Sequence, residues 1–288
     1  MGNWTAAMAL LFGLLTGGEA VARAPVRIVA AENFYGDVAA QIGGTAVAVT
    51  SVLDNPSQDP HLFEASPSVA RAVAAADIVI YNGVSYDPWM PRLIAAAHRD
   101  GQRVIVAASL IGAREGANPH IWYDPETMPA VAGALLEALV AVDPEHAAQY
   151  RQRREDFARG FQPVLERIAA MRARLAGAAV TATEPVAGYL FAALGLRVRN
   201  EAFARAVMNE TEPAASQVAA FENDLKNHRV SLLAYNSQAS GPIAERMAGL
   251  ARAAGVRVVA MSETEPAGTS YQRWMLDALD AIDQAMAR

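Results

Sequence analysis

The chain has 288 residues, of which 53% are hydrophobic and 19% charged, with no cysteine and a formal net charge of −6 at pH 7. The lack of cysteine excludes disulfides, thiolate catalysis and cysteine-ligated zinc or iron–sulfur sites. The acidic balance offers no basic surface to a phosphate backbone, so we expect no nucleic-acid partner. A chain of this length exceeds the size at which one hydrophobic core usually stops growing, which predicts two lobes.

Residues 1–22 have the pattern of a secretory signal peptide. An apolar run extends from Ala6 to Leu15, and small residues end at Ala20-Val21-Ala22, as at an A-x-A cleavage site. The run is about ten residues long, half of what a membrane-spanning helix needs. A buried first helix is the alternative interpretation. Because no cysteine follows the run, we expect no lipid anchor and predict export of the mature chain, most simply to a bacterial periplasm.

Two segments of the remaining chain resemble each other. A β-branched run leads to Glu32 and a helical stretch closing at Gly43, and a second run leads to Glu184 and a helix closing at Gly195, with the same Glu-to-Gly spacing. Later apolar runs repeat in the same order, since 77–82 resembles 230–236 and 101–107 resembles 255–260. The sequence therefore predicts two copies of one α/β unit.

Each unit is predicted to hold about four short parallel strands with helices on both faces, so that functional side chains gather beyond the carboxyl ends of the strands. Between the units, residues 143–177 carry aromatic and aliphatic side chains at helical spacing. One long helix there would act as a stiff connection. The predicted organisation is an N-terminal α/β lobe over 23–142, a linking helix over 143–177 and a C-terminal α/β lobe over 178–288.

His61 and His120 differ from the other three histidines, because each directly follows a proline in a polar loop. Proline fixes its own φ and restricts the residue before it, so both imidazoles are expected on stiff loops that could present metal ligands. The other three, His98, His146 and His228, lie near predicted helix ends, where a structural role is the usual one. Spacing alone leaves the metal interpretation open, since no H-E-x-x-H signature is present.

Four stretches taken together resemble the solute-binding proteins of zinc and manganese ABC importers. They are NPSQDPH at 55–61, NPHIWYDP at 118–125, EPVAGY at 184–189, and 262–271 with its SET and TSY motifs. The resemblance covers essentially the whole mature chain. It implies two α/β lobes joined by one long helix, with one divalent metal ion as cargo between them. It also implies delivery to a membrane permease without covalent chemistry, so we expect a monomer that is not an enzyme.

The resemblance also implies four metal ligands, one from each stretch. His61 and His120 take the first two positions. Glu184 takes the third, where zinc-type members often carry His and many manganese-type members carry Glu. Glu263 takes the fourth, where many members carry Asp; Glu265 or a water molecule is the alternative there.

Charge arithmetic is compatible with this set, because two neutral imidazoles and two carboxylates balance a divalent cation and so permit its burial. Mixed nitrogen and oxygen donors suit both zinc and manganese. The imidazole nitrogens that do not face the metal need acceptors of their own, and Asp59, Glu64 and Asp124 are the acids near the two histidines, or else simple loop caps.

Two other functions remain open from the sequence. An exported zinc-dependent hydrolase would use two His and a carboxylate with an open water position, although no general base beside the ligands is evident. A receptor for an organic solute would make the histidine pair incidental. Binding measurements on metal-stripped protein separate these functions from metal capture.

Overall fold

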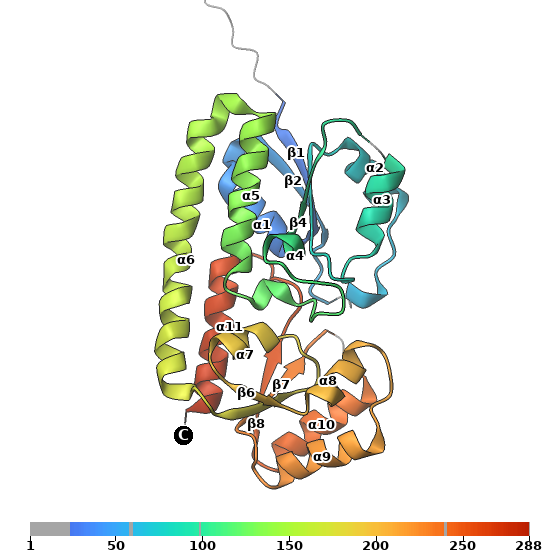
Figure 1. The fold of residues 1–288 in the computed structure, drawn as a ribbon, viewed down its shortest axis with the longest axis vertical. Coiled ribbons are helices and arrows are strands. Elements are labelled where there is room, and N and C mark those ends of the chain that lie inside the picture. Colours follow the sequence, from blue (N-terminus) through green and yellow to red (C-terminus); the bar gives the residue numbers. More distant parts are fainter. Residues whose placement is uncertain (1–23, 58–59, 98, 239–240, 288) are drawn as a thin grey trace, which may run out of the picture.

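The computed structural model describes residues 24–57, 60–97, 99–238 and 241–287, without the side chain of His61. The predicted signal peptide lies outside these residues. Two lobes are stacked along the long axis of the molecule, and one long helix runs beside both of them (Figure 1).

The first lobe is built on a parallel sheet in the order β2-β1-β3-β4. The two inner strands are almost fully buried, which explains why their sequences are continuous apolar runs without polar alternation. The strands are β1 (Val26–Glu32), β2 (Val47–Leu53), β3 (Ile78–Tyr81) and β4 (Arg103–Val106). The helices are α1 (Asn33–Gly43), α2 (Pro67–Ala75), α3 (Trp89–Ala97), α4 (Ala107–Leu110) and α5 (Thr127–Val142).

The second lobe repeats this topology, because its parallel sheet has the equivalent order β6-β5-β7-β8. Its strands are β5 (Ala179–Ala182), β6 (Arg197–Arg199), β7 (Leu232–Asn236) and β8 (Arg257–Met261). Its helices are α7 (Gly188–Ala193), α8 (Glu201–Met208), α9 (Ala215–Lys226), α10 (Pro242–Ala253) and α11 (Tyr271–Met286). The α/β class and the two four-stranded parallel sheets predicted from the sequence are confirmed.

Helix α6 (Ala147–Leu175) connects the lobes and continues through Pro163. A short 3₁₀ turn, Pro144–His146, precedes it, so the regular helix begins four residues after the predicted position. Asp143 lies before this turn and accepts hydrogen bonds from Tyr150 Oη at 2.6 Å and from His146 Nδ1 at 2.7 Å. On the inner face, Phe161 stacks on Phe157 and on Tyr271 of α11, so α6 is packed onto the final helix of the other lobe.

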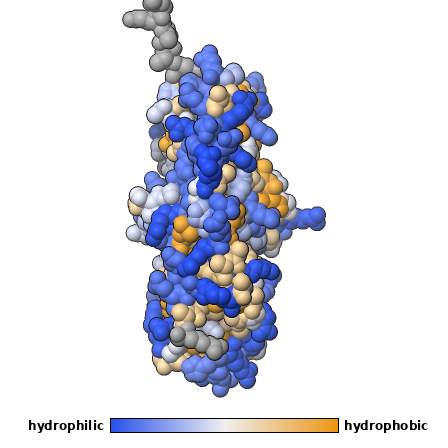
Figure 2. Space-filling view, turned by 90° about the vertical axis from the view of Figure 1, so that its left-hand side faces the viewer, coloured by the Kyte–Doolittle hydropathy of each residue, from blue (hydrophilic) through white to orange (hydrophobic). Residues whose placement is uncertain are grey.

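The molecular surface on the side where α6 lies is mostly hydrophilic, with small separate apolar areas (Figure 2). In the described part of the chain, no helix is both long enough and apolar enough to cross a bilayer.

Direct hydrogen bonds join the two lobes across their seam. The side-chain amide of Asn33 on α1 donates to the carbonyl of Glu265 at 2.7 Å and accepts from its N–H at 3.1 Å. Tyr271 Oη donates to the carbonyl of Trp122 at 2.6 Å, and Tyr123 Oη donates to the carbonyl of Ser262 at 2.9 Å. The lobes therefore meet through specific, direct hydrogen bonds.

Candidate metal site

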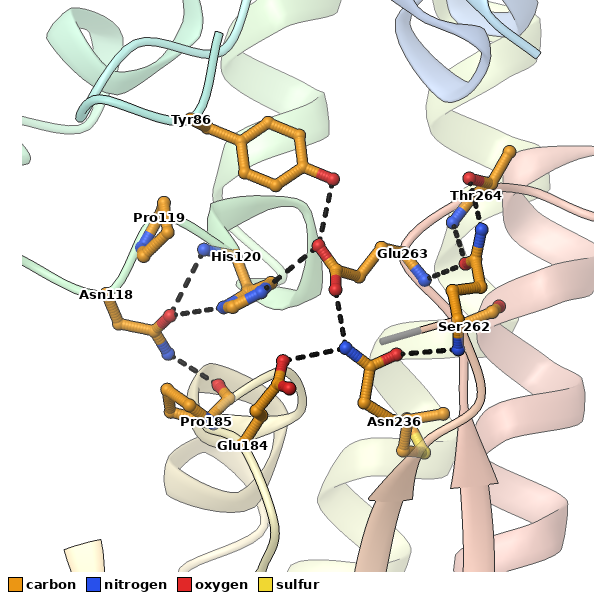
Figure 3. A network of polar contacts seen from close by, with 12 residues as sticks. Tyr86, Asn118, Pro119, His120, Glu184, Pro185, Asn236, Ser262, Glu263 and Thr264 are labelled. Atoms are coloured by element: carbon orange, nitrogen blue, oxygen red, sulfur yellow. Dashed lines mark hydrogen bonds and ion pairs between the residues drawn. The ribbon is translucent and has the colours of Figure 1, made fainter. Parts of the chain in front are cut away.

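Three of the four predicted ligand segments meet at the seam between the lobes (Figure 3). His120 belongs to the first lobe and opens the short 3₁₀ helix Ile121–Tyr123. Glu184 follows β5, and Glu263 follows β8, so both lie beyond the carboxyl ends of parallel strands. This is the edge of a parallel sheet where ligand sites are expected.

The imidazole of His120 faces the carboxylate of Glu263 from the opposite lobe. His120 Nε2 and Glu263 Oε2 lie 3.4 Å apart, and both side chains are 0% exposed. Among the described residues, Nε2 has no hydrogen-bond partner. A buried polar atom without a partner is rare and costly in a folded protein, so this nitrogen is a candidate ligand atom.

Glu263 is held in place by two neutral donors. Tyr86 Oη donates to Oε2 at 2.9 Å, and Asn236 Nδ2 donates to Oε1 at 2.6 Å. Burial, followed by the negative charge of Glu263, raises the pKa of Tyr86 well above its usual range, so this phenol stays a hydrogen-bond donor. The carboxylate therefore has a fixed orientation toward His120.

The amide of Asn236 links the two carboxylates. Its Nδ2 also donates to Glu184 Oε2 at 2.7 Å, while its Oδ1 accepts from the N–H of Gln238 at 3.0 Å. One amide group can satisfy both acids because Nδ2 carries two hydrogens. The site thus brings His120, Glu184 and Glu263 into one buried network.

Sequence reasoning assigned no role to Asn236 or Tyr86. The one available signal for Asn236 was its place at the end of β7, where the repeated unit of the first lobe carries Asn82. Nothing local marks Tyr86, because its partner Glu263 lies 177 residues later in the chain.

Of the two interpretations that the sequence left open for the nearby acids, the structure supports the loop cap for Asp124, and the partner of the second imidazole nitrogen of His120 is an amide. Its Nδ1 lies 2.6 Å from Oδ1 of Asn118, an amide within the same motif. Asp124 instead accepts from the N–H of Glu126 as a loop cap, and Glu64 is exposed. Asp59 lies outside the described residues. The side-chain amide of Asn118 takes the role of hydrogen-bond partner to the His120 ring, because Asn118 lies only two residues before His120 in the chain.

Glu265, the alternative fourth ligand, lies beside α1. Its backbone pairs with Asn33, and burial, followed by the charge of Asp37, raises its pKa to about 9. Its side chain belongs to the interface with α1, whereas Glu263 faces His120.

His61 lies in a 3₁₀ turn, Pro60–Leu62, and its side chain is outside the described part. Among the side chains that are described, no three from His, Asp and Glu form a group able to hold a metal by themselves. The four-ligand set therefore stays a prediction.

Comparison with known families gives one match over almost the whole chain. The ZnuA family model, described as zinc-uptake complex component A, periplasmic, matches residues 28–285. Among curated relatives, the manganese-binding lipoprotein MntA of Bacillus subtilis is 27% identical over 48% of this chain and 47% of its own length. A putative metal-binding protein of Thermotoga maritima is 26% identical over 59% of this chain and 62% of its own length. The alignments thus span about half of these relatives.

Solved structures share the fold over a greater length. The periplasmic zinc-binding protein TroA of Treponema pallidum superposes with a TM-score of 0.75 at 19% identity, covering 92% of this chain and all of that one. The solute-binding protein FpvC of P. aeruginosa in complex with Ni²⁺ gives 0.74 at 20% identity, covering 91% and 97%. At these identities the likeness shows the fold.

Proposed function

Because the chain belongs to the ZnuA family of zinc-uptake components, we propose that it captures a divalent transition metal, zinc or manganese, between its lobes and delivers it to the membrane permease of an ABC importer. The same proposal assigns the metal to His61, His120, Glu184 and Glu263. The cargo is bound and released unchanged, so the protein performs no covalent chemistry.

The single observation that carries the proposal is the pairing of His120 Nε2 with Glu263 Oε2. Their separation of 3.4 Å leaves the nitrogen without a hydrogen bond in the described structure, although both groups are buried. Two ligand atoms that share a tetrahedral Zn²⁺ at about 2.0–2.1 Å lie about 3.3 Å from each other. The pair is therefore spaced as two donors to one cation would be.

The remaining groups supply the charge that a divalent cation needs. Glu184 and Glu263 both accept a hydrogen bond from Asn236 Nδ2, and two carboxylates held so near each other would repel when both are ionised. A bound cation would offset their repulsion, and a neutral His61 would complete a set with no net charge. The hydrolase alternative has less support, since Glu263, the carboxylate nearest His120, already accepts hydrogen bonds from Tyr86 and Asn236.

We also propose a periplasmic location and a monomeric state, with no nucleic-acid partner. The predicted signal peptide supports export, and the formal charge of −6 supports the absence of nucleic acid.

Metal binding to stripped protein tests the function. Zinc and manganese are titrated separately in competition with a chelating dye. We expect one bound ion per chain, and a loss of at least about tenfold in affinity for His61→Ala, His120→Ala and Glu263→Gln, because each removes a direct ligand.

His228→Asn is the matched control, because His228 is exposed at a helix end with φ 51°, a conformation that Asn tolerates. It should bind metal as the parent protein does. Binding of an organic solute without binding of either metal would refute the proposed function, and equal losses for all four variants would refute the ligand assignment.

A further inference from the structure

The side chain of Asn118 lies at the seam and contacts both lobes (Figure 3). Its Oδ1 lies 2.6 Å from Nδ1 of His120 and accepts from the N–H of His120 at 3.2 Å. Its Nδ2 donates to the carbonyl of Pro185 in the second lobe at 2.7 Å. Pro185 directly follows Glu184, so one amide lies between two of the proposed ligand segments.

Two backbone groups determine which way this amide points. The N–H of His120 can only donate, and the carbonyl of Pro185 can only accept, so the oxygen must face His120 and the nitrogen must face Pro185. Rotation by 180° would place like groups against each other at both ends.

The orientation of the amide determines the protonation of the ring. Because Nδ1 of His120 faces an oxygen that accepts only, Nδ1 must carry the hydrogen of the neutral imidazole. Nε2 then keeps its lone pair, and this is the nitrogen that faces Glu263. A metal can bind only to the nitrogen that has no hydrogen.

From this geometry we propose that Asn118 is a positioning residue that fixes His120 in the metal-binding tautomer, and that docking of the second lobe through Pro185 locks Asn118 in place. This inference rests on the proposed metal-binding function for its consequence, although the tautomer itself is a property of the metal-free protein. Separation of the lobes would remove one of the two groups that fix the amide, and so would weaken the preference of His120 for its metal-binding form.

Hydrogen bonds hold Asn118 more than packing does. The residue is only half-buried and borders a cavity of about 650 Å³, so the amide has room to turn. Gly188 supplies the close approach on the other side, because a Cβ atom there would lie 2.9 Å from Nδ2 of Asn118. A side chain at position 188 would push the amide away from Pro185.

The test compares Asn118→Ala with Asn118→Asp. Nitrogen-15 NMR of histidine-labelled, metal-free protein at a pH where imidazole is neutral reports the tautomer, and the His120 signal is assigned by its loss in His120→Gln. We expect the Nδ1–H form in the parent protein and in Asn118→Asp, which keeps an acceptor oxygen beside the ring. Asn118→Ala should shift the ring toward the Nε2–H form.

Zinc affinity supplies the second readout. Asn118→Ala should bind zinc about 10–100-fold more weakly, and Asn118→Asp should recover only part of that loss, because its carboxylate can accept from the ring but cannot donate to Pro185. Asn227→Ala, at an exposed helix end, is the matched control and should change neither quantity. Thermal unfolding verifies that each variant is folded.

An unchanged tautomer in a folded Asn118→Ala protein would overturn the inference, as would equal zinc affinities for the Ala and Asp variants. If the parent protein bound no zinc or manganese while the tautomer shifted as expected, the proposed function would fail and the positioning role of Asn118 would stand.

Discussion

At the scale of single residues, the first lobe contains a buried acidic pair that the metal site does not use. Glu32 ends β1 at the position equivalent to Glu184, and its buried side chain lies close to that of Asp87. Burial, followed by the charge of nearby Asp87, raises the pKa of Glu32 well above its usual range. Asp87 accepts from the N–H groups of Asn82 and Gly83, yet its burial still raises its pKa to about 6.

This pair predicts a specific pH dependence of stability. Raised folded-state pKa values mean that the folded protein holds these protons more tightly than the unfolded chain does. The stabilising contribution is therefore greatest below the ordinary carboxyl pKa of about 4. It is lost as the pH rises through the raised pKa values of the two acids, which for Asp87 is about 6.

Glu32→Gln should remove most of the loss of stability at high pH, because the amide stays neutral and can donate to Asp87. We expect the variant to be about 1–2 kcal/mol more stable than the parent protein at pH 8 and to show a flatter pH profile. Denaturant unfolding from pH 5 to 8 measures both effects. Glu245→Gln, on the exposed face of α10, is the control, and a destabilised Glu32→Gln with an unchanged profile would contradict the assignment.

The sequence predicted the parts of the site that depend on local pattern. Proline before His120 and the position of Glu184 and Glu263 just after apolar runs were visible in the chain itself. The roles of Tyr86, Asn118 and Asn236 depend on pairings between segments that only the folded lobes bring together. Hydrogen-bond partners of this kind leave no periodic signal, so the sequence could not supply them.

At the scale of elements, prediction succeeded where amphipathic periodicity was long. Helix α1 ends at Gly43, as the sequence predicted. The linking helix was predicted to start at residue 143, but Asp143 lies before α6 and accepts hydrogen bonds from Tyr150 and His146. The 3₁₀ turn Pro144–His146 lies between Asp143 and the first residue of α6.

The contact of α6 with α11 gives a prediction about stability. Phe161 is 2% exposed and stacks on Phe157 and Tyr271, so Phe161→Ala leaves a cavity between two helices from different parts of the chain. We expect a loss of about 3–5 kcal/mol in the free energy of unfolding. Leu165 is 39% exposed on the same helix. Its replacement by Ala should cost about 0.5 kcal/mol or less, as surface changes usually do. Similar losses for the two variants would refute the packing role.

At the scale of the whole molecule, the lobes are held by one continuous helix and by hydrogen bonds at the seam. Asn33, Tyr123 and Tyr271 each bond to backbone groups of the facing lobe. Wide opening would break these bonds together and would expose buried aromatic surface. We therefore expect capture and release of metal to involve local rearrangement of loops.

Solution scattering tests this expectation. The radius of gyration of metal-free and metal-loaded protein should differ by less than about 1 Å, the scale of movement in preorganised complexes. Asn33→Ala removes two hydrogen bonds across the seam and should increase the difference. A change of several ångströms in the parent protein would show that the lobes swing apart.

The connection of the two lobes by helix α6 also bears on how a permease could distinguish metal-loaded from metal-free protein. If the distance between the lobes stays constant, the overall shape of the metal-free protein is the same as that of the metal-loaded protein. We therefore expect a permease to recognise the metal-loaded protein through short stretches beside the proposed ligands, such as the turn Pro60–Leu62, where Leu62 is 72% exposed. Replacement of Leu62 by a polar residue would then change how a permease distinguishes metal-loaded from metal-free protein, while His61 and the other proposed ligands stay in place.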